Sequence, residues 1–265
     1  MSPPHVHIVP TLAVMRDIYA LSRHGGAASP RFLAYRAVVE STFGLSAYNP
    51  MAGDHARATV DALLAVDAEE VAGEAAASVA RDAGHPTALT LAIVVASPGL
   101  WTDRVGTEVL VRTTGERVDG MGTVLFWARE PVTAEHVVHE ARAEAVRALW
   151  TAVHGPARTV RAVLEREGLA SAVGGSCPDV LPSDDAAVSL ALEVYGESSV
   201  MGEIGAAAFG DAIAAQMGWA PLGVPDRGGL HFAAHHAARL LRRAGLRDAL
   251  HTTRWLSVPP DGATE

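Results

Sequence analysis

Apolar residues recur at intervals of three and four over most of the chain, which is the spacing of amphipathic helices. Leu12, Met15, Ile18 and Tyr19 follow this spacing directly after Thr11, a residue type that often caps a helix. The same pattern continues until Gly84, where glycine is typical of a helix end. The N-terminal third therefore predicts four helices, over residues 11–23, 31–43, 54–66 and 68–83.

Two short apolar runs interrupt this helical pattern. Residues 88–97 read ALTLAIVVAS between Pro86 and Pro98, and residues 123–128 read TVLFWA. Runs of this length that are rich in β-branched residues are typical of buried strands. Between them, residues 105–113 alternate like a third strand, although Glu108 to Arg112 also suits a helix. We predict a strand there.

Helical spacing returns after Pro131 and predicts five more helices, over residues 133–153, 156–172, 184–195, 199–217 and 229–244. Helices, then two or three strands, then helices again predict an α+β fold rather than a doubly wound one, which needs regular alternation. We expect a mostly helical single domain over residues 11–256, with a small two- or three-stranded sheet within a helical shell. Residues 1–10 are expected to be a flexible N-terminus and residues 257–265 a frayed tail.

Composition excludes several chemistries. All 21 basic residues are arginine, because the 265-residue sequence contains no lysine. A Schiff base to pyridoxal phosphate, an aldolase-type imine and a P-loop each need a lysine. The chain is therefore expected to use no pyridoxal phosphate and to bind no triphosphate through a P-loop.

Charge and cysteine content indicate the environment of the protein. The net charge of −9 repels a nucleic-acid backbone, so nucleic acid is not an expected partner. The single cysteine, Cys177, allows no internal disulfide, and residues 1–10 do not resemble a signal peptide. The longest strongly apolar run is too short to span a bilayer. We expect a cytoplasmic protein without a membrane partner.

The first candidate site lies in the predicted helix over residues 199–217, SVMGEIGAAAFGDAIAAQM, which is apolar or small nearly all the way round. Such a helix is usually buried. Glu203 and Asp211 stand almost alone in it as charges, and on one helix they would be about 80° apart at about 100° per residue. A buried carboxylate needs an arginine, a metal or a hydrogen-bond network. Both carboxylates are therefore candidate catalytic groups, the alternative being a buried ion pair or exposure of Glu203.

The second candidate site consists of histidines in GGLHFAAHHAARLLRR. His231 and His235 are one helical turn apart and have the spacing to grip one metal ion, with Glu203 as a further ligand from the neighbouring helix. A solvated histidine and arginine face is the alternative. His136, His139 and Glu140 form a similar but more exposed group.

The third candidate site follows the first predicted strand. The loop SPGLWTDR places Trp101 and Arg104 at the carboxyl end of that strand, where α/β proteins often hold ligands. Arg104 has the geometry to clamp a substrate carboxylate while Trp101 forms a pocket wall. In the alternative reading, Arg104 pairs with Asp103 or Glu108 and Trp101 is part of the core.

Three functions remain open from the sequence. The leading hypothesis is a metal-dependent hydrolase, lyase or oxygenase of small-molecule metabolism, with iron or zinc as the divalent metal and a carboxylate-bearing substrate. The second is a haem or other cofactor protein, with one of the 12 histidines as axial ligand. The third is a non-catalytic binding or assembly protein, in which the small-residue helix forms the interface of a homodimer or other homo-oligomer.

Overall fold

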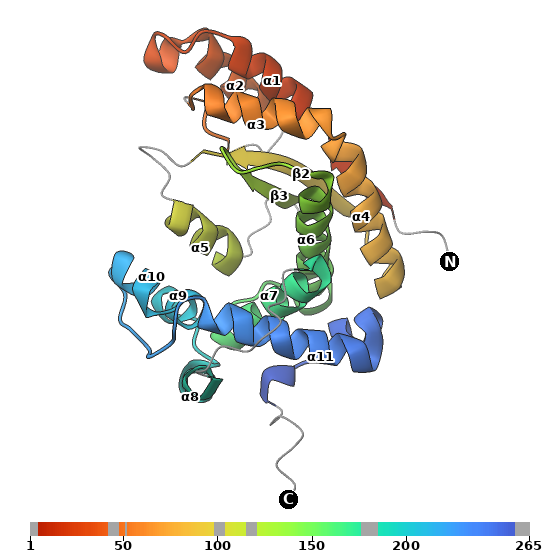
Figure 1. Ribbon diagram of the computed structural model, residues 1–265, viewed down its shortest axis with the longest axis vertical. Coiled ribbons are helices and arrows are strands. Elements are labelled where there is room, and N and C mark those ends of the chain that lie inside the picture. The colour runs from red at the N-terminus through yellow and green to blue at the C-terminus, as the bar shows by residue number, and fades with distance from the viewer. Residues whose placement is uncertain are drawn as a thin grey trace, which may run out of the picture. The chain divides into compact units, whose positions relative to one another are not determined.

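The computed structural model describes residues 5–41, 48–50, 52–97, 104–114, 121–175 and 185–257. Within these ranges it is mostly helical and contains one small three-stranded sheet, so the predicted α+β class is confirmed (Figure 1). The chain forms two compact units. Unit 1 comprises residues 1–104 and 117–148, and unit 2 comprises residues 105–116 and 149–265. The single domain predicted over residues 11–256 stays a prediction, because two such units occur both within one domain and as separate domains.

Unit 1 is built on the parallel sheet β1-β2-β3, with β1 at Val6–Val9, β2 at Leu89–Ala96 and β3 at Met121–Trp127. The central strand β2 is buried along nearly its whole length, as its continuous apolar run requires. Strand β1 lies in the segment expected to be flexible, and it pairs with β2 from Val6 opposite Leu89 to Val9 opposite Ala92. The alternation that marks a half-buried strand is too short there to predict from sequence.

Helices α1 (Leu12–Ala20), α2 (Pro30–Ser41) and α3 (Asp54–Ala65) lie together on one side of the sheet (Figure 1). Helix α4 (Ala68–Ala83) packs against β1. One oxygen of Glu69 accepts hydrogen bonds from the backbone amides of Thr11 (2.7 Å) and Leu12 (2.9 Å), and so caps α1 from a different helix. The buried guanidinium of Arg31 donates to the carbonyls of Tyr19, Leu21 and Ala52, which fixes the connections around α1 and α3. Helix α6 (Ala134–His154) begins in unit 1 and ends in unit 2.

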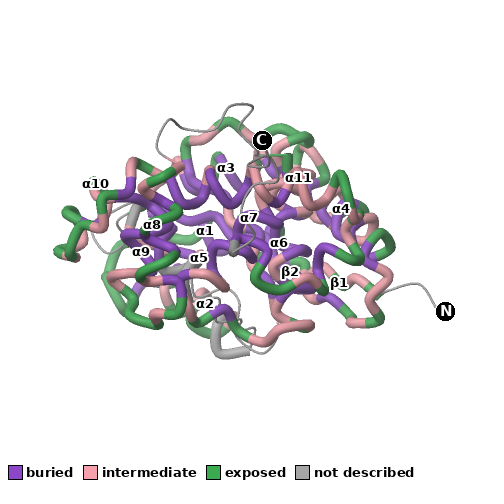
Figure 2. The backbone as a smooth tube through the Cα atoms, turned by 90° about the horizontal axis from the view of Figure 1, so that it is seen from below, coloured by how far each residue is buried: buried purple, intermediate pink, exposed green. Residues whose placement is uncertain are grey.

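Unit 2 is helical in its described residues. Helix α7 (Val160–Gly174) contacts α11 (Gly228–His251) most extensively and is buried on nearly every side of its middle turns (Figure 2). Helices α8 (Asp185–Tyr195), α9 (Met201–Phe209) and α10 (Asp211–Gln216) complete the unit, together with the short 3-10 turn at Trp255–Ser257. Thr159 caps α7, accepting a hydrogen bond from the amide of Ala162.

Three consecutive charged residues lie in the buried middle of α7, namely Glu165, Arg166 and Glu167. Arg166 donates to Glu167 (3.0 Å) and to the carbonyl of Arg112, while Arg112 also contacts Glu167 (3.4 Å). The chain of ion pairs continues from Arg112 to Glu108 (3.3 Å) and from Glu108 to Arg227, whose two donors each lie 2.9 Å from a carboxylate oxygen. Burial of Arg166 and Glu167 is tolerated because each contacts an opposite charge, whereas Glu165 accepts a hydrogen bond from the amide of Leu256 and burial raises its pKa.

The strand predicted over residues 105–113 is wrong, because this segment is helix α5 (Arg104–Thr114). Glu108 and Arg112 pair across one helical turn at 3.3 Å, which a strand does not permit because its side chains alternate between faces. The spacing of Glu108 and Arg112, which suits a helix, was therefore the better predictor of this segment than the alternation of its apolar residues.

The single helix predicted over residues 199–217 is also wrong. It breaks at Gly210, whose φ of 88° lies in the region that favours glycine. A side chain at this position would also collide with the carbonyl of Pro225. The small residues of α9 serve packing inside unit 2, since a Cβ on Gly205 would lie 2.0 Å from the ring of Trp219.

Candidate active site

The carboxyl end of the sheet in unit 1 gathers polar residues. Thr11 follows β1 closely, Ser97 follows β2, and Arg129 and Glu130 follow β3. Parallel strands end at the same edge, and in open parallel sheets ligands bind outside this edge. Two of these residues have structural roles that are plain from their contacts: Thr11 donates to the carbonyl of Ile93, and Glu130 pairs with Arg104.

Ser97 forms the chemically most distinctive contact of this edge. Its Oγ lies 2.7 Å from Nε2 of His55, which is in the first turn of α3. Ser97 follows the central strand and is only 3% exposed, whereas His55 is partly exposed. A serine hydroxyl within hydrogen-bond reach of an imidazole is the arrangement of an activated nucleophile and its general base.

Burial and nearby arginines favour the neutral form of His55. Burial lowers the pKa of His55 below its usual value of 6.5, and the charge of Arg129 lowers it further. Asp54 raises this pKa and Arg23 lowers it, both with smaller effects than burial. The lowered pKa favours the neutral imidazole, and Nε2 is able to accept the proton of Ser97 when the ring carries its own proton on Nδ1.

Arg129 is held beside His55 by the backbone. Its φ of 80° is unusual for a residue with a side chain, and strained positions of this kind cluster at functional sites. The amide of Arg129 donates to Oγ1 of Thr59 (3.2 Å), which itself donates to the carbonyl of His55 (3.0 Å). Thr59 thus ties the turn after β3 to the first turn of α3.

The site carries an excess of positive charge in a chain of net charge −9. Within the described residues, the guanidinium groups of Arg129 and Arg23 form no ion pair or hydrogen bond. Among the described residues, no carboxylate accepts a hydrogen bond from His55. Ser97 and His55 therefore form a dyad, without a third residue in that part of the chain to orient the imidazole. The unpaired arginines make the edge suitable for an anionic ligand.

Arg104, the predicted carboxylate clamp, lies at the same end of the sheet but has a protein partner. It forms an ion pair with Glu130, and its guanidinium lies 5.3 Å from the centre of the Trp127 ring. The partner of Arg104 in this ion pair is Glu130. The alternative reading of the sequence expected Asp103 or Glu108 instead. Trp101 lies outside the described residues, as does Cys177.

The two candidate carboxylates lie on different helices. Asp211 begins α10, and its oxygens accept hydrogen bonds from the amides of Leu222 (2.8 Å) and Gly223 (3.0 Å). It therefore anchors the loop before α11. Glu203 is in the first turn of α9 and is partly exposed. The 80° separation expected on one continuous helix does not apply, because the helix breaks between them.

His231 and His235 are on α11, which packs against α9, the helix of Glu203. Both histidines are partly exposed. Among the described residues, however, no group of three or more His, Cys, Asp or Glu side chains is arranged to hold a metal ion. Metal-dependent and haem functions stay predictions, which elemental analysis and the absorption spectrum of the purified protein test.

His55, Ser97 and Arg129 are not among the site residues predicted from the sequence. A signal for Ser97 and Arg129 was present, since each is a polar residue at the end of an apolar run that predicts a strand. His55 offered no such signal, because the contact with Ser97 joins residues 42 positions apart in a fold that the sequence pattern does not specify.

Comparisons with protein-family models, with curated proteins and with solved structures found no match. Among the described helices, none combines the length and the apolar character that crossing a bilayer requires.

Proposed function

We propose that this chain is an enzyme of the acyl-transfer class that hydrolyses small esters bearing a negative charge, with Ser97 as nucleophile and His55 as general base. The observation that carries the proposal is the 2.7 Å contact between Oγ of Ser97 and Nε2 of His55 at the end of the central strand. Ser97 is only 3% exposed, and we therefore expect it to react only with small acyl groups.

The reaction follows from the roles of the two side chains. Oγ of Ser97 attacks the ester carbonyl while His55 takes the hydroxyl proton, and the resulting imidazolium gives this proton to the leaving alcohol. Water then attacks the acyl-serine with His55 again acting as base. This step releases the acid and restores the serine hydroxyl, so no external oxidant or reductant is needed.

Arg129 supports the proposed preference for an anionic substrate. Its charge opposes formation of an imidazolium on His55 in the free enzyme. An anion bound beside Arg129 offsets that charge and so raises the basicity of His55 when substrate is present. The carboxylate-bearing substrate expected from the sequence is retained in this proposal, with Arg129 in the role first assigned to Arg104.

The proposal is tested by acetylation with 4-nitrophenyl acetate, a small activated ester. We expect a burst of nitrophenolate and a single acetyl group on the Ser97 peptide, detected by mass spectrometry after rapid acid quenching. Ser97→Ala is expected to lose both, while Ser78→Ala, at a partly exposed serine of α4, is expected to retain both. Acetylation at other residues with none on Ser97 would overturn the proposal.

Replacing Arg129 with asparagine is expected to shift the acid limb of the acetylation rate to higher pH. Acetylation needs neutral His55, so the rate falls as pH decreases through the pKa of His55. The charge of Arg129 lowers this pKa, and its removal therefore raises it. Asparagine tolerates a positive φ better than most residues.

The pH profile is measured from pH 4 to 8 for wild type, Arg129→Asn and the control Arg57→Gln. Arg57 lies in α3 near His55 but pairs with Asp61. Arg129→Asn is further expected to remove the preference for mono-4-nitrophenyl succinate over the uncharged pentanoate. If the acid limb of the pH profile and the preference for the succinate ester are both unchanged in Arg129→Asn, Arg129 is not part of the site.

A further inference from the structure

Helix α4 presents an exposed acid and an exposed base on the same face. Glu74 and Arg81 are seven residues apart, which is about two helical turns or about 10.5 Å along the axis. Neither side chain forms an ion pair or a hydrogen bond with another residue that the structure describes. Two opposite charges at this spacing are too far apart to pair with each other.

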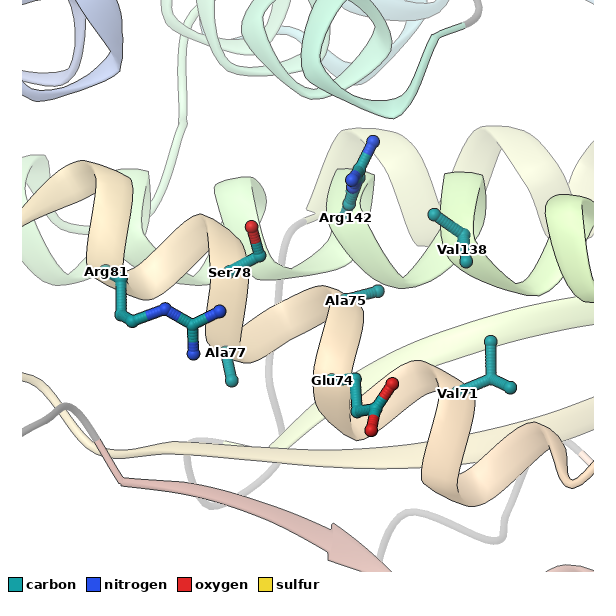
Figure 3. A pocket seen from close by; sticks show the side chains of 8 residues that line it. All are labelled: Val71, Glu74, Ala75, Ala77, Ser78, Arg81, Val138 and Arg142. Atoms are coloured by element: carbon teal, nitrogen blue, oxygen red, sulfur yellow. The ribbon is translucent and has the colours of Figure 1, made fainter.

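Small residues lie between these two charges. Ala77 and Ser78 occupy the middle of the interval, and the surface there is hollowed by an open pocket of about 510 Å³. Its lining comes from α4 and α6 of unit 1 (Figure 3). In Figure 3, Glu74, Ala77 and Arg81 follow one side of α4, while Val138 and Arg142 belong to α6. Small side chains at the centre allow another helix to approach closely, towards the short end of the 8–10 Å range of helix packing.

We propose that this face of α4 binds the same face of a second copy of the chain, related by a two-fold axis. The midpoint between Glu74 and Arg81 falls between Ala77 and Ser78. When two α4 helices pack antiparallel about this point, Glu74 of each copy lies opposite Arg81 of the other. The small residues then meet at the axis.

Charge complementarity favours a second copy over an unrelated partner. A two-fold interface uses the same patch on both subunits and therefore needs acid and base placed symmetrically about the axis. The arrangement of Glu74 and Arg81 satisfies this condition within a single helix. Val71 and Val138 add apolar surface to the interface. The inference is independent of the proposed ester hydrolysis, because none of these residues belongs to the site of Ser97 and His55.

Sedimentation equilibrium over a wide range of protein concentration tests this proposal. The wild-type chain of 27.6 kDa is expected to approach twice this mass as concentration rises. Glu74→Arg and Arg81→Glu each place like charges opposite one another, and each is expected to remain at the monomer mass. The double variant exchanges the two charges and is expected to recover the dimer, which a merely misfolded protein would not do.

Matched controls change the same charges elsewhere. Glu193→Arg on α8 and Arg247→Glu on α11 alter exposed residues and are expected to leave the dimer unchanged. A wild-type protein that stays monomeric at every concentration would overturn the proposal, and so would a dimer that survives both single reversals. Failure of the double variant to recover the dimer, with a native circular dichroism spectrum, would also overturn it.

Discussion

Replacing His55 with glutamine lowers the acetylation rate of Ser97 by roughly 10²- to 10⁴-fold, the range that general bases contribute. Glutamine keeps a polar group near Oγ of Ser97 but is unable to take up its proton. The serine must then attack without the imidazole that lies 2.7 Å from Oγ. The measurement is the burst rate with 4-nitrophenyl acetate at pH 7.5.

The control for this experiment is His24→Gln, which alters an exposed histidine in the loop after α1. It is expected to react at the wild-type rate. Because the rate of the His55 variant no longer depends on imidazole protonation, its acid limb should also disappear. A His55→Gln protein that acetylates Ser97 as fast as wild type would show that the 2.7 Å contact is structural only.

The sequence predicted the fold better than the site, because the two depend on interactions of different range. Most helices and the strands at Leu89–Ala96 and Met121–Trp127 carry local periodic patterns or apolar runs. Strand β1 has only four residues, and its identity comes from pairing with β2 far away in sequence. The segment of α5 has an alternating apolar pattern that suits a strand and a Glu108–Arg112 spacing that suits a helix. It is a helix, and these two residues form an ion pair across one turn.

The candidate site could be predicted only in location. The carboxyl end of β2 was expected to bind ligands, and Arg104 does lie at that end of the sheet. The partner of Ser97 could not be predicted, because the distance between two side chains depends on how α3 packs on the sheet. Glu203 and Asp211 were predicted as catalytic groups because a carboxylate in an apolar helix needs a partner. The helix breaks at Gly210 between them, and Asp211 accepts hydrogen bonds from two backbone amides.

The burial of three charged residues of α7 in unit 2 also could not be predicted from the sequence pattern. Periodicity predicts a helix there, but Glu and Arg residues such as those at positions 165–167 are ordinarily exposed. Arg166 and Glu167 tolerate burial because Arg112 and Glu108 of α5 and Arg227 before α11 extend their ion pairs across three elements. Glu165 accepts a hydrogen bond from the amide of Leu256. Only the tertiary contacts make this burial physically acceptable.

Replacing Glu167 with glutamine destabilises the protein by about 3–5 kcal/mol, the usual cost of removing one partner of a buried ion pair. Glu167 is completely buried and accepts hydrogen bonds from Arg166 and Arg112. Glutamine removes the negative charge and turns an amide donor towards guanidinium donors. Arg166, which is only 1% exposed, is left with the carbonyl of Arg112 and no opposite charge. The measurement is urea unfolding followed by circular dichroism and by tryptophan fluorescence.

Glu165→Gln is the matched control, because it changes the same residue type two positions away. Burial raises the pKa of Glu165, so its protonated form is less costly than usual, and glutamine resembles that form. Its oxygen still accepts the hydrogen bond from the amide of Leu256. We therefore expect a much smaller loss of stability than for Glu167→Gln. The double variant Arg166→Met, Glu167→Leu removes both charges together and is expected to recover part of the loss. Equal stability of the two single glutamine variants would show that the charge of Glu167 is not what holds Arg166 in the core of unit 2.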